Sequence, residues 1–215
     1  MPALVPPKPR LRGRIHQVAF FVSIPSGLAL VLLAEGVAAT AVTAVYASSL
    51  TAVFGTSAAY HRGSWSERVL SWMKRLDHSL IFVLIAGSYT PVAVLVLSGP
   101  WEVVLLATAW AGAAVGITLK MVKPHGLAVV SSVLYMALGW LALVALPQLI
   151  DGMTLPELVL MVAGGCLYTV GAIVFAARRP NPRPAVFGYH EVWHAFMVAA
   201  ASCHYAMIAL VLRSS

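Results

Sequence analysis

The chain has 215 residues, of which 60% are hydrophobic and 10% are charged, and its formal net charge is +7. A soluble domain carries about 25% charged residues, so this composition excludes a water-soluble globular protein. The positive charge does not indicate nucleic-acid binding, because the basic residues lie in short segments between long apolar runs and form no basic domain. The chain is therefore expected to lie in a membrane.

Seven apolar runs follow one another, each close to the roughly 20 residues that cross a bilayer core. The expected spans are residues 17–33, 40–60, 80–97, 101–119, 127–146, 158–177 and 190–212. The first run follows a basic stretch, as in a signal peptide, but it is too long for one and six more spans follow. The predicted fold class is an all-α integral membrane protein. A single seven-helix domain at 17–212 is expected between a short basic N-terminus at 1–16 and a short tail at 213–215.

The placement of lysine and arginine gives an independent check on the number of spans. Four basic residues precede the first span, four lie between the second and third, two follow the fourth and three follow the sixth. With seven spans and a cytoplasmic N-terminus, 13 of the 14 basic residues are cytoplasmic, and the exception is Arg213. An error of one helix would destroy this alternation. The pattern therefore predicts a multi-pass inner-membrane protein with its N-terminus in the cytoplasm and its C-terminus outside.

Ionisable residues at membrane depth are costly and mark functional sites, and three groups of polar residues stand at the ends of spans. Ser57 and His61 close the second span, Asp77 precedes the third, and the seventh begins with His190-Glu-Val-Trp-His194. The topology derived from lysine and arginine alone places all three groups at the cytoplasmic face. We therefore expect these groups to form one site.

The spacing of the histidines predicts a zinc ion in that site. His190 and His194 are four residues apart and share one face of a helix, which provides half of a tetrahedral zinc site. His61 could supply a third nitrogen, which leaves one position for water, as in a catalytic zinc site. Zinc would lower the pKa of that water, and Asp77 could orient the water or accept its proton. Ser57 could hold a ligand in place or donate a hydrogen bond to a substrate carbonyl.

The other histidines are expected outside the metal shell. A lone histidine at a helix end is usually an interfacial polar residue, so His16 is expected to reach the interface or to be paired there. His78 points about 100° away from the aspartate before it, which favours contact with solvent or headgroups, and His125 is expected in solvent. His204 lies roughly 15 Å along the helix axis from His194, so it either lines a cavity or satisfies a buried hydrogen bond.

HEVWH at 190–194 also matches the H-E-x-x-H pattern of metalloproteases, with Glu191 as the base. Most such enzymes take a third ligand further along the chain, whereas only 21 residues follow His194 and His204 is too close on the same helix. Glu191 is therefore expected to stabilise the N-terminus of its helix through its negative charge, or to support the metal ligands without binding the metal itself.

Taken together, these motifs resemble the hemolysin III family, the bacterial branch of the progestin and adipoQ receptor superfamily. The resemblance rests on Arg14-Ile-His-Gln-Val-Ala-Phe20, Ser57-x-x-x-His61, Asp77 in RLDHS, GSYTP at 87–91 and HEVWH at 190–194. It implies that His61, His190 and His194 bind zinc, while Asp77 acts through a water molecule. It also implies a location in the bacterial plasma (inner) membrane.

Two functions from different classes remain open. The wider superfamily resembles alkaline ceramidases, which implies a zinc-dependent hydrolase of a lipid amide or ester. Its substrate would be a membrane lipid and its role would lie in membrane-lipid homeostasis. The alternative is a non-catalytic membrane sensor or receptor in which a structural zinc ion ties helices together. A channel is disfavoured because the charged residues gather at one face and not at the midplane.

Overall fold

The computed structural model describes residues 8–122 and 128–214, and its regular structure is helical apart from an isolated bridge between Arg183 and Phe187. Its elements are α1 (Arg14–Leu33), α2 (Val37–Arg62), α3 (Glu67–Val96), α4 (Pro100–Val122), α5 (Ala128–Gly139), a 3-10 segment η1 (Leu141–Ala145), α6 (Leu146–Gly152), α7 (Leu155–Ala177) and α8 (Tyr189–Ser214). Seven helical stretches in the described part are long and apolar enough to cross a membrane, the fifth being Val129–Gly152. The all-α class is confirmed, and the structure has seven candidate membrane-spanning helices, as the sequence predicted.

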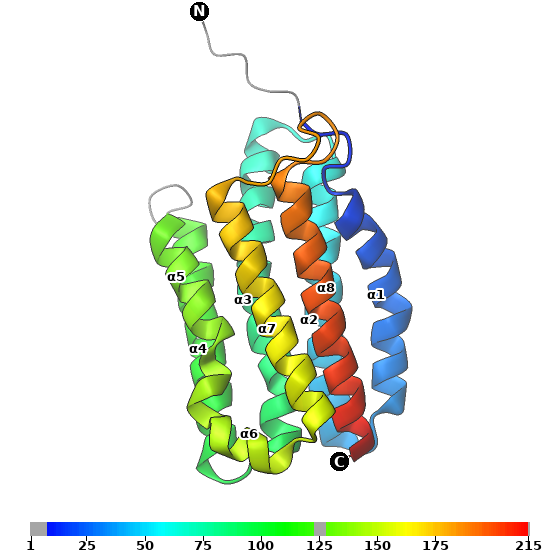
Figure 1. The fold of residues 1–215 in the computed structure, drawn as a ribbon, viewed down its shortest axis with the longest axis vertical. Helices are drawn as coiled ribbons and strands as arrows, with labels where there is room; N and C mark the ends of the chain where they lie inside the picture. Colours follow the sequence, from blue (N-terminus) through cyan, green and yellow to red (C-terminus); the bar gives the residue numbers. More distant parts are fainter. Residues whose placement is uncertain (1–7, 123–127, 215) are drawn as a thin grey trace, which may run out of the picture.

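The spans lie side by side along the long axis of the bundle, with the start of α1 and the end of α8 at opposite ends (Figure 1). Helix α8 packs against α7, α1 and α3, and α2 packs between α1 and α3. Large apolar side chains such as Val18, Leu32 and Val103 remain exposed on the outside of the bundle. An outer surface of this kind suits contact with lipid tails, because it would be costly in water.

Helix α3 begins at Glu67, about four turns earlier than the expected span at 80–97. Hydropathy detects only the apolar part of a helix, whereas Lys74 and Arg75 continue the same helix beyond it. Ser66 precedes the helix and Glu67 stands in its first turn, where a negative charge is favourable. Asp77 is therefore held within a helix and not at its start.

The fifth span also differs from the single helix expected at 127–146. Helix α5 ends at Gly139, and the chain continues through η1 into α6, which has Pro147 in its first turn. Glycine weakens a helix interior and proline is tolerated only in the first turn, so the span is built from short pieces. Helix α6 lies at the end of the bundle opposite the start of α1 (Figure 1).

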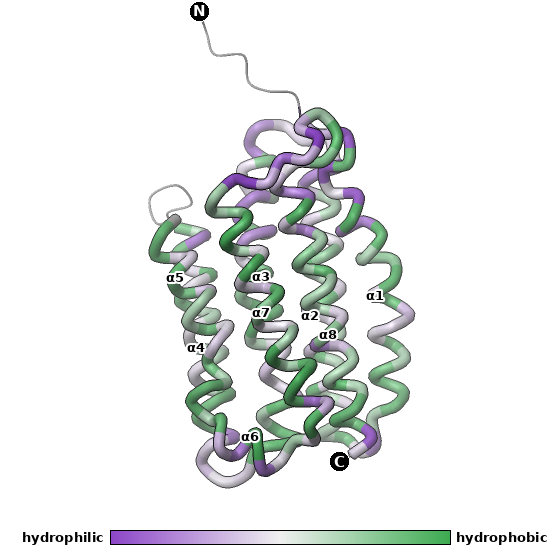
Figure 2. The backbone as a smooth tube through the Cα atoms, in the orientation of Figure 1, coloured by the Kyte–Doolittle hydropathy of each residue, from purple (hydrophilic) through white to green (hydrophobic). Residues whose placement is uncertain are grey.

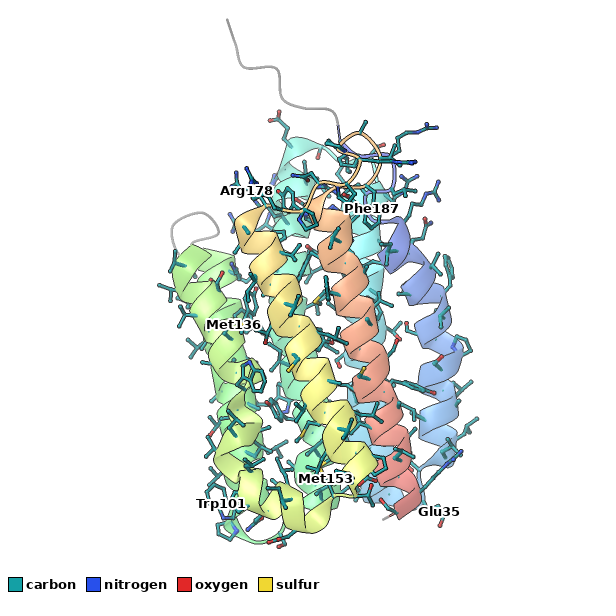
Figure 3. The ribbon with its side chains drawn as sticks, viewed as in Figure 1. Glu35, Trp101, Met136, Met153, Arg178 and Phe187 are labelled. Carbon is teal, nitrogen blue, oxygen red and sulfur yellow. The ribbon has the colours of Figure 1, made fainter. Side chains whose placement is uncertain are left out.

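Hydrophilic residues gather most densely at the end of the bundle that carries the N-terminal segment and the loop between α7 and α8 (Figure 2). Arg178 and Phe187 mark that loop, whereas Glu35, Trp101 and Met153 lie at the opposite end (Figure 3). We call the end with the N-terminal segment the basic end, because it brings together the basic residues of four separate segments.

Candidate metal centre

Three histidines from two helices converge at the basic end. His61 lies in the last turn of α2, and His190 and His194 lie in the first two turns of α8. One ligand nitrogen from each lies within 4.8 Å of the other two, and the Nε2 atoms of His61 and His190 are 3.2 Å apart. His61 is 6% exposed and His194 is 2% exposed. The structure thus brings together the three residues for which the sequence predicted ligation.

This donor set fits a metal ion. Nitrogens about 2.0–2.1 Å from a tetrahedral zinc ion stand roughly 3.4 Å from one another, and the observed separation of 3.2 Å between His61 and His190 agrees with that value. His194 Nδ1 is buried and has no hydrogen-bond partner within the described chain. A buried polar atom left unpaired costs about 1–3 kcal/mol. Three imidazoles suit zinc and also accept other transition metals.

The local sequence explains why α8 starts where it presents these rings. The carboxylate of Glu191 accepts a hydrogen bond from the backbone N–H of Gly188 at 2.7 Å, which satisfies one of the free donors at the helix start. Asn181 accepts a second one, from the N–H of Tyr189 at 3.0 Å. The helix is therefore fixed at its first residue, and the i, i+4 spacing turns His190 and His194 to the same side.

Glu191 is 1% exposed and forms an ion pair with Arg12. From the sequence, Glu191 was expected to stabilise the N-terminus of its helix or to support the metal ligands. In the structure it lies in the first turn of α8, between His190 and His194 in the chain. The sequence did not identify Arg12 as its partner, because the two residues lie far apart in the chain. A buried carboxylate needs such a partner, so Arg12 ties the N-terminal segment to the ligand-bearing turn.

Residues 8–13, which we call the strap, lie across this end of the bundle. The backbone N–H groups of Arg10 and Leu11 donate to the carbonyls of Ala185 and Val186 in the α7–α8 loop, both at 3.1 Å. Gly13 has φ +78°, and a Cβ atom there would stand 2.5 Å from His61 Cβ. Only glycine allows this approach, so the strap is in contact with a candidate ligand residue.

Lys8 is the second cation that the strap brings to the site. Its amino group donates a hydrogen bond to the carbonyl oxygen of His61, which belongs to the last turn of α2. A cation at a helix C-terminus is favourable because the last carbonyls are unpaired. Burial, followed by repulsion from Arg12 and Arg62, lowers the pKa of the Lys8 amino group.

The two polar residues predicted to act beside the metal lie next to each other. Ser57 on α2 is 3% exposed and makes a side-chain hydrogen bond to Asp77 on α3. The side chain of Asp77 is 15% exposed. Asp77 is not part of the group of converging ligand atoms. It is a carboxylate beside Ser57 and not a candidate metal ligand. Ser57 holds Asp77 and not one of the three candidate ligands.

His16 on α1 is the histidine whose position the sequence described least well. An interfacial or paired position was expected, and the ring is paired but deeply buried, with 3% exposure. It is stacked on the ring of His194, with centroids 3.7 Å apart and planes 13° apart. A metal ion lies in the plane of each ring that binds it, so one ion cannot bind both of these nearly parallel rings. His16 therefore contacts the candidate ligand His194 without sharing its metal.

The remaining histidines lie elsewhere. His78 is partly exposed and its Nδ1 lies 2.6 Å from the carbonyl oxygen of Lys74 on its own helix. His204 is half-buried, and its Nε2 lies 3.3 Å from the carbonyl oxygen of Met161 on α7, so of its two expected roles the hydrogen bond is the one that the structure supports. His125 falls outside the described residues.

Comparison with known proteins adds independent information. The family described as "Haemolysin-III related" matches residues 5–205. "Hemolysin-3" of Bacillus cereus is 33% identical over 190 residues, which cover 87% of this chain and 84% of that protein. The "Hemolysin-3 homolog" of Bacillus subtilis (strain 168) is 27% identical over 190 residues, covering 87% and 86%. The human "Monocyte to macrophage differentiation factor" is 27% identical over 168 residues, covering 76% and 67%.

Proposed function

This chain belongs to the Haemolysin-III related family, and we propose that it is a zinc-dependent hydrolase of a lipid amide or ester in a bacterial plasma membrane. The observation that carries the proposal is the convergence of three imidazoles from α2 and α8, of which those of His61 and His194 are buried, next to the pair formed by Ser57 and Asp77. Three protein ligands leave a position for water, as catalytic zinc sites do. The stacked ring of His16 does not fill that position.

The roles of the residues follow from their chemistry. Zinc, when bound, supplies Lewis acidity and lowers the pKa of a water molecule at its open position. His61, His190 and His194 would hold the ion. Asp77, held by the hydroxyl of Ser57, is the carboxylate available to orient a water molecule and to accept its proton. The strap and the ion pair of Arg12 with Glu191 would limit access of bulk water from the basic end.

A lipid substrate is supported by a groove on the side of the bundle. The groove measures about 790 Å³, lies between α1 and α2, and extends from Val31 to Ala59 with mostly apolar lining. Ala59 precedes His61 by two residues, so the groove reaches the helix turn that carries a candidate ligand. An acyl chain in this groove would lie along the bundle with its polar end near the histidines, which suits hydrolysis at the headgroup linkage.

The distribution of basic residues supports a cytoplasmic location of the site. Thirteen of the 14 basic residues belong to segments on the predicted cytoplasmic side of the sequence topology. The hydrophilic residues gather at the end that carries the strap (Figure 2). By the positive-inside rule, this end, the N-terminus and the histidines would face the cytoplasm, and the C-terminus would face outward.

A non-catalytic sensor is the second candidate, and the strap favours it. Lys8, Gly13 and Arg12 close over His61 and Glu191 from the basic end. A covered site of this kind could use zinc only to join α2 to α8. Loss of the metal would then reduce stability and change no reaction.

The test separates these two functions with one substitution that spares the three histidines. Purified protein loaded with zinc is incubated with lipid amides and lipid esters, and the released fatty acid is measured. Asp77→Asn should keep its zinc and lose about 10²–10⁴-fold in turnover, the size of a general acid–base contribution. Asp151→Asn, an exposed carboxylate on α6, is the matched control and should keep full activity. Fully zinc-loaded wild type that cleaves neither class would leave the sensor as the function.

A further inference from the structure

The imidazole of His16 is buried inside the bundle, where a polar side chain needs hydrogen-bond partners. It lies on the face of α1 that packs into the bundle, one turn before Ala19 and two before Ser23. Its Nδ1 lies 2.8 Å from the hydroxyl of Ser57, and its Nε2 is buried with no hydrogen-bond partner in the part of the chain that the structure describes. Burial of a half-satisfied imidazole is costly, and such groups require an explanation.

The hydroxyl of Ser57 links this ring to Asp77. A hydroxyl has one proton to donate, and an ionised carboxylate can only accept. If the proton of Ser57 goes to Asp77, then His16 must donate from Nδ1 to the Ser57 oxygen. The resulting chain connects α1, α2 and α3 through three side chains. It also fixes the tautomer of His16 with the proton on Nδ1.

The same ring supports a candidate metal ligand. His16 and His194 are stacked at 3.7 Å with nearly parallel planes. The ring of Phe54 lies on another side of His16, with centroids 5.1 Å apart. Packing of this kind limits rotation of His194 about its side-chain bonds, and groups that orient a metal-binding histidine raise its affinity for the metal.

From these contacts we infer that His16 is a positioning residue of the metal centre, which orients Asp77 through Ser57 and orients His194 by stacking. The assignment of Asp77 as the base rests on the proposed function, whereas the effect on metal binding does not. Helix α1 thus contributes to the centre without supplying a ligand. The opposite tautomer would leave Nδ1 as an acceptor and would take the Ser57 proton away from Asp77.

Two conservative substitutions distinguish the two ring nitrogens. An asparagine amide reaches the position of Nδ1, and a glutamine amide reaches that of Nε2. Zinc affinity is measured on the full-length protein by competition with a chelator. His16→Leu should weaken zinc binding about 10–100-fold, the effect of losing a group that supports a ligand. His16→Asn should recover part of this loss, because it restores the bond to Ser57 on the helix that carries His61 but not the stacked ring, and His16→Gln should recover none.

The following results decide the inference. Equal zinc affinity in all three variants, with only thermal stability reduced, would overturn it and make His16 a packing residue. Rescue by His16→Gln instead of His16→Asn would overturn the tautomer. If the protein hydrolyses lipid, kcat should fall in His16→Leu while KM stays near the wild-type value. If zinc binding follows the expected pattern and no variant hydrolyses lipid, the positioning role stands and the proposed hydrolase fails.

Discussion

Two stretches of α8 contain histidines in very different surroundings. In the first two turns, His190 and His194 meet groups from other parts of the chain: the rings of His16 and His61, with the Arg12–Glu191 ion pair alongside. About three turns later, His204 lies 3.3 Å from one backbone carbonyl of α7 and packs edge-on against the ring of Tyr168 at 5.5 Å.

The difference shows that convergence marks a site better than burial does. Both stretches place an imidazole inside an apolar bundle, where it must find a partner. His204 finds one in its neighbouring helix, and Gly164 of that helix leaves the space for its ring. The first stretch instead gathers histidines and charges from three helices and the strap, which simple packing does not require.

The largest expected effect is loss of metal from the first stretch. His190→Ala removes one of three ligands and should weaken zinc binding by more than about 100-fold, beyond the effect of losing a supporting group. Wild-type protein should hold about one zinc ion per chain by elemental analysis after purification in detergent. His61→Ala should behave like His190→Ala. His204→Ala is the matched control and should keep its zinc; comparable loss there would remove the distinction between the two stretches.

The second effect concerns the ion pair that links the strap to α8. Arg12→Met leaves the carboxylate of Glu191, which is 1% exposed, without its cation. Breaking a buried pair from one side costs about 3–5 kcal/mol, so the midpoint of thermal unfolding in detergent should fall by several degrees. Arg14→Met is the control, because Arg14 is exposed and its side chain bonds Gln17 on its own helix. Adding Glu191→Gln to Arg12→Met should restore part of the loss. Equal midpoints for the two arginine variants would argue against a structural role of the strap.

Much of the fold was predictable because each span is an apolar run of sufficient length. The start of α3 at Glu67 was missed because charged residues extend a helix past its apolar part, where hydropathy has no signal. The break after Gly139 was missed because a single glycine in an apolar run does not show whether the helix continues. Both errors concern where a helix begins or ends and not whether it exists.

The candidate site was predictable to the extent that it depends on spacing. The i, i+4 relation of His190 and His194, and the position of His61 at the same predicted face, needed no contacts. Arg12 and His16 were missed because their roles depend on long-range packing against Glu191 and His194. One signal was available for His16: together with Ala19, Ser23, Gly27 and Leu30 it follows the 3–4 residue spacing of the buried face of α1.

The smallest expected effect belongs to the second stretch of α8. A Cβ atom at Gly164 would stand 2.3 Å from His204 Cδ2 and 3.2 Å from the carbonyl oxygen of Ala200, so Gly164→Ala should overpack the α7–α8 contact. Such overpacking costs about 1–3 kcal/mol. At Gly165 the added Cβ would lie 3.7 Å from the Trp140 ring, an ordinary contact. Gly165→Ala should therefore be neutral or gain up to about 1 kcal/mol from its helix propensity.

A double variant shows whether His204 is the cause of that effect. Gly164→Ala with His204→Ala removes the ring that the new methyl group meets, so its midpoint of thermal unfolding should lie above that expected from adding the two single effects. Zinc content should equal that of wild type in all of these variants, because the disturbed contact lies about 15 Å along α8 from His194. Strict additivity would show that the clash lies with the backbone of Ala200. Loss of zinc from Gly164→Ala would show that the two stretches of α8 are coupled, and His204 would then belong to the metal centre.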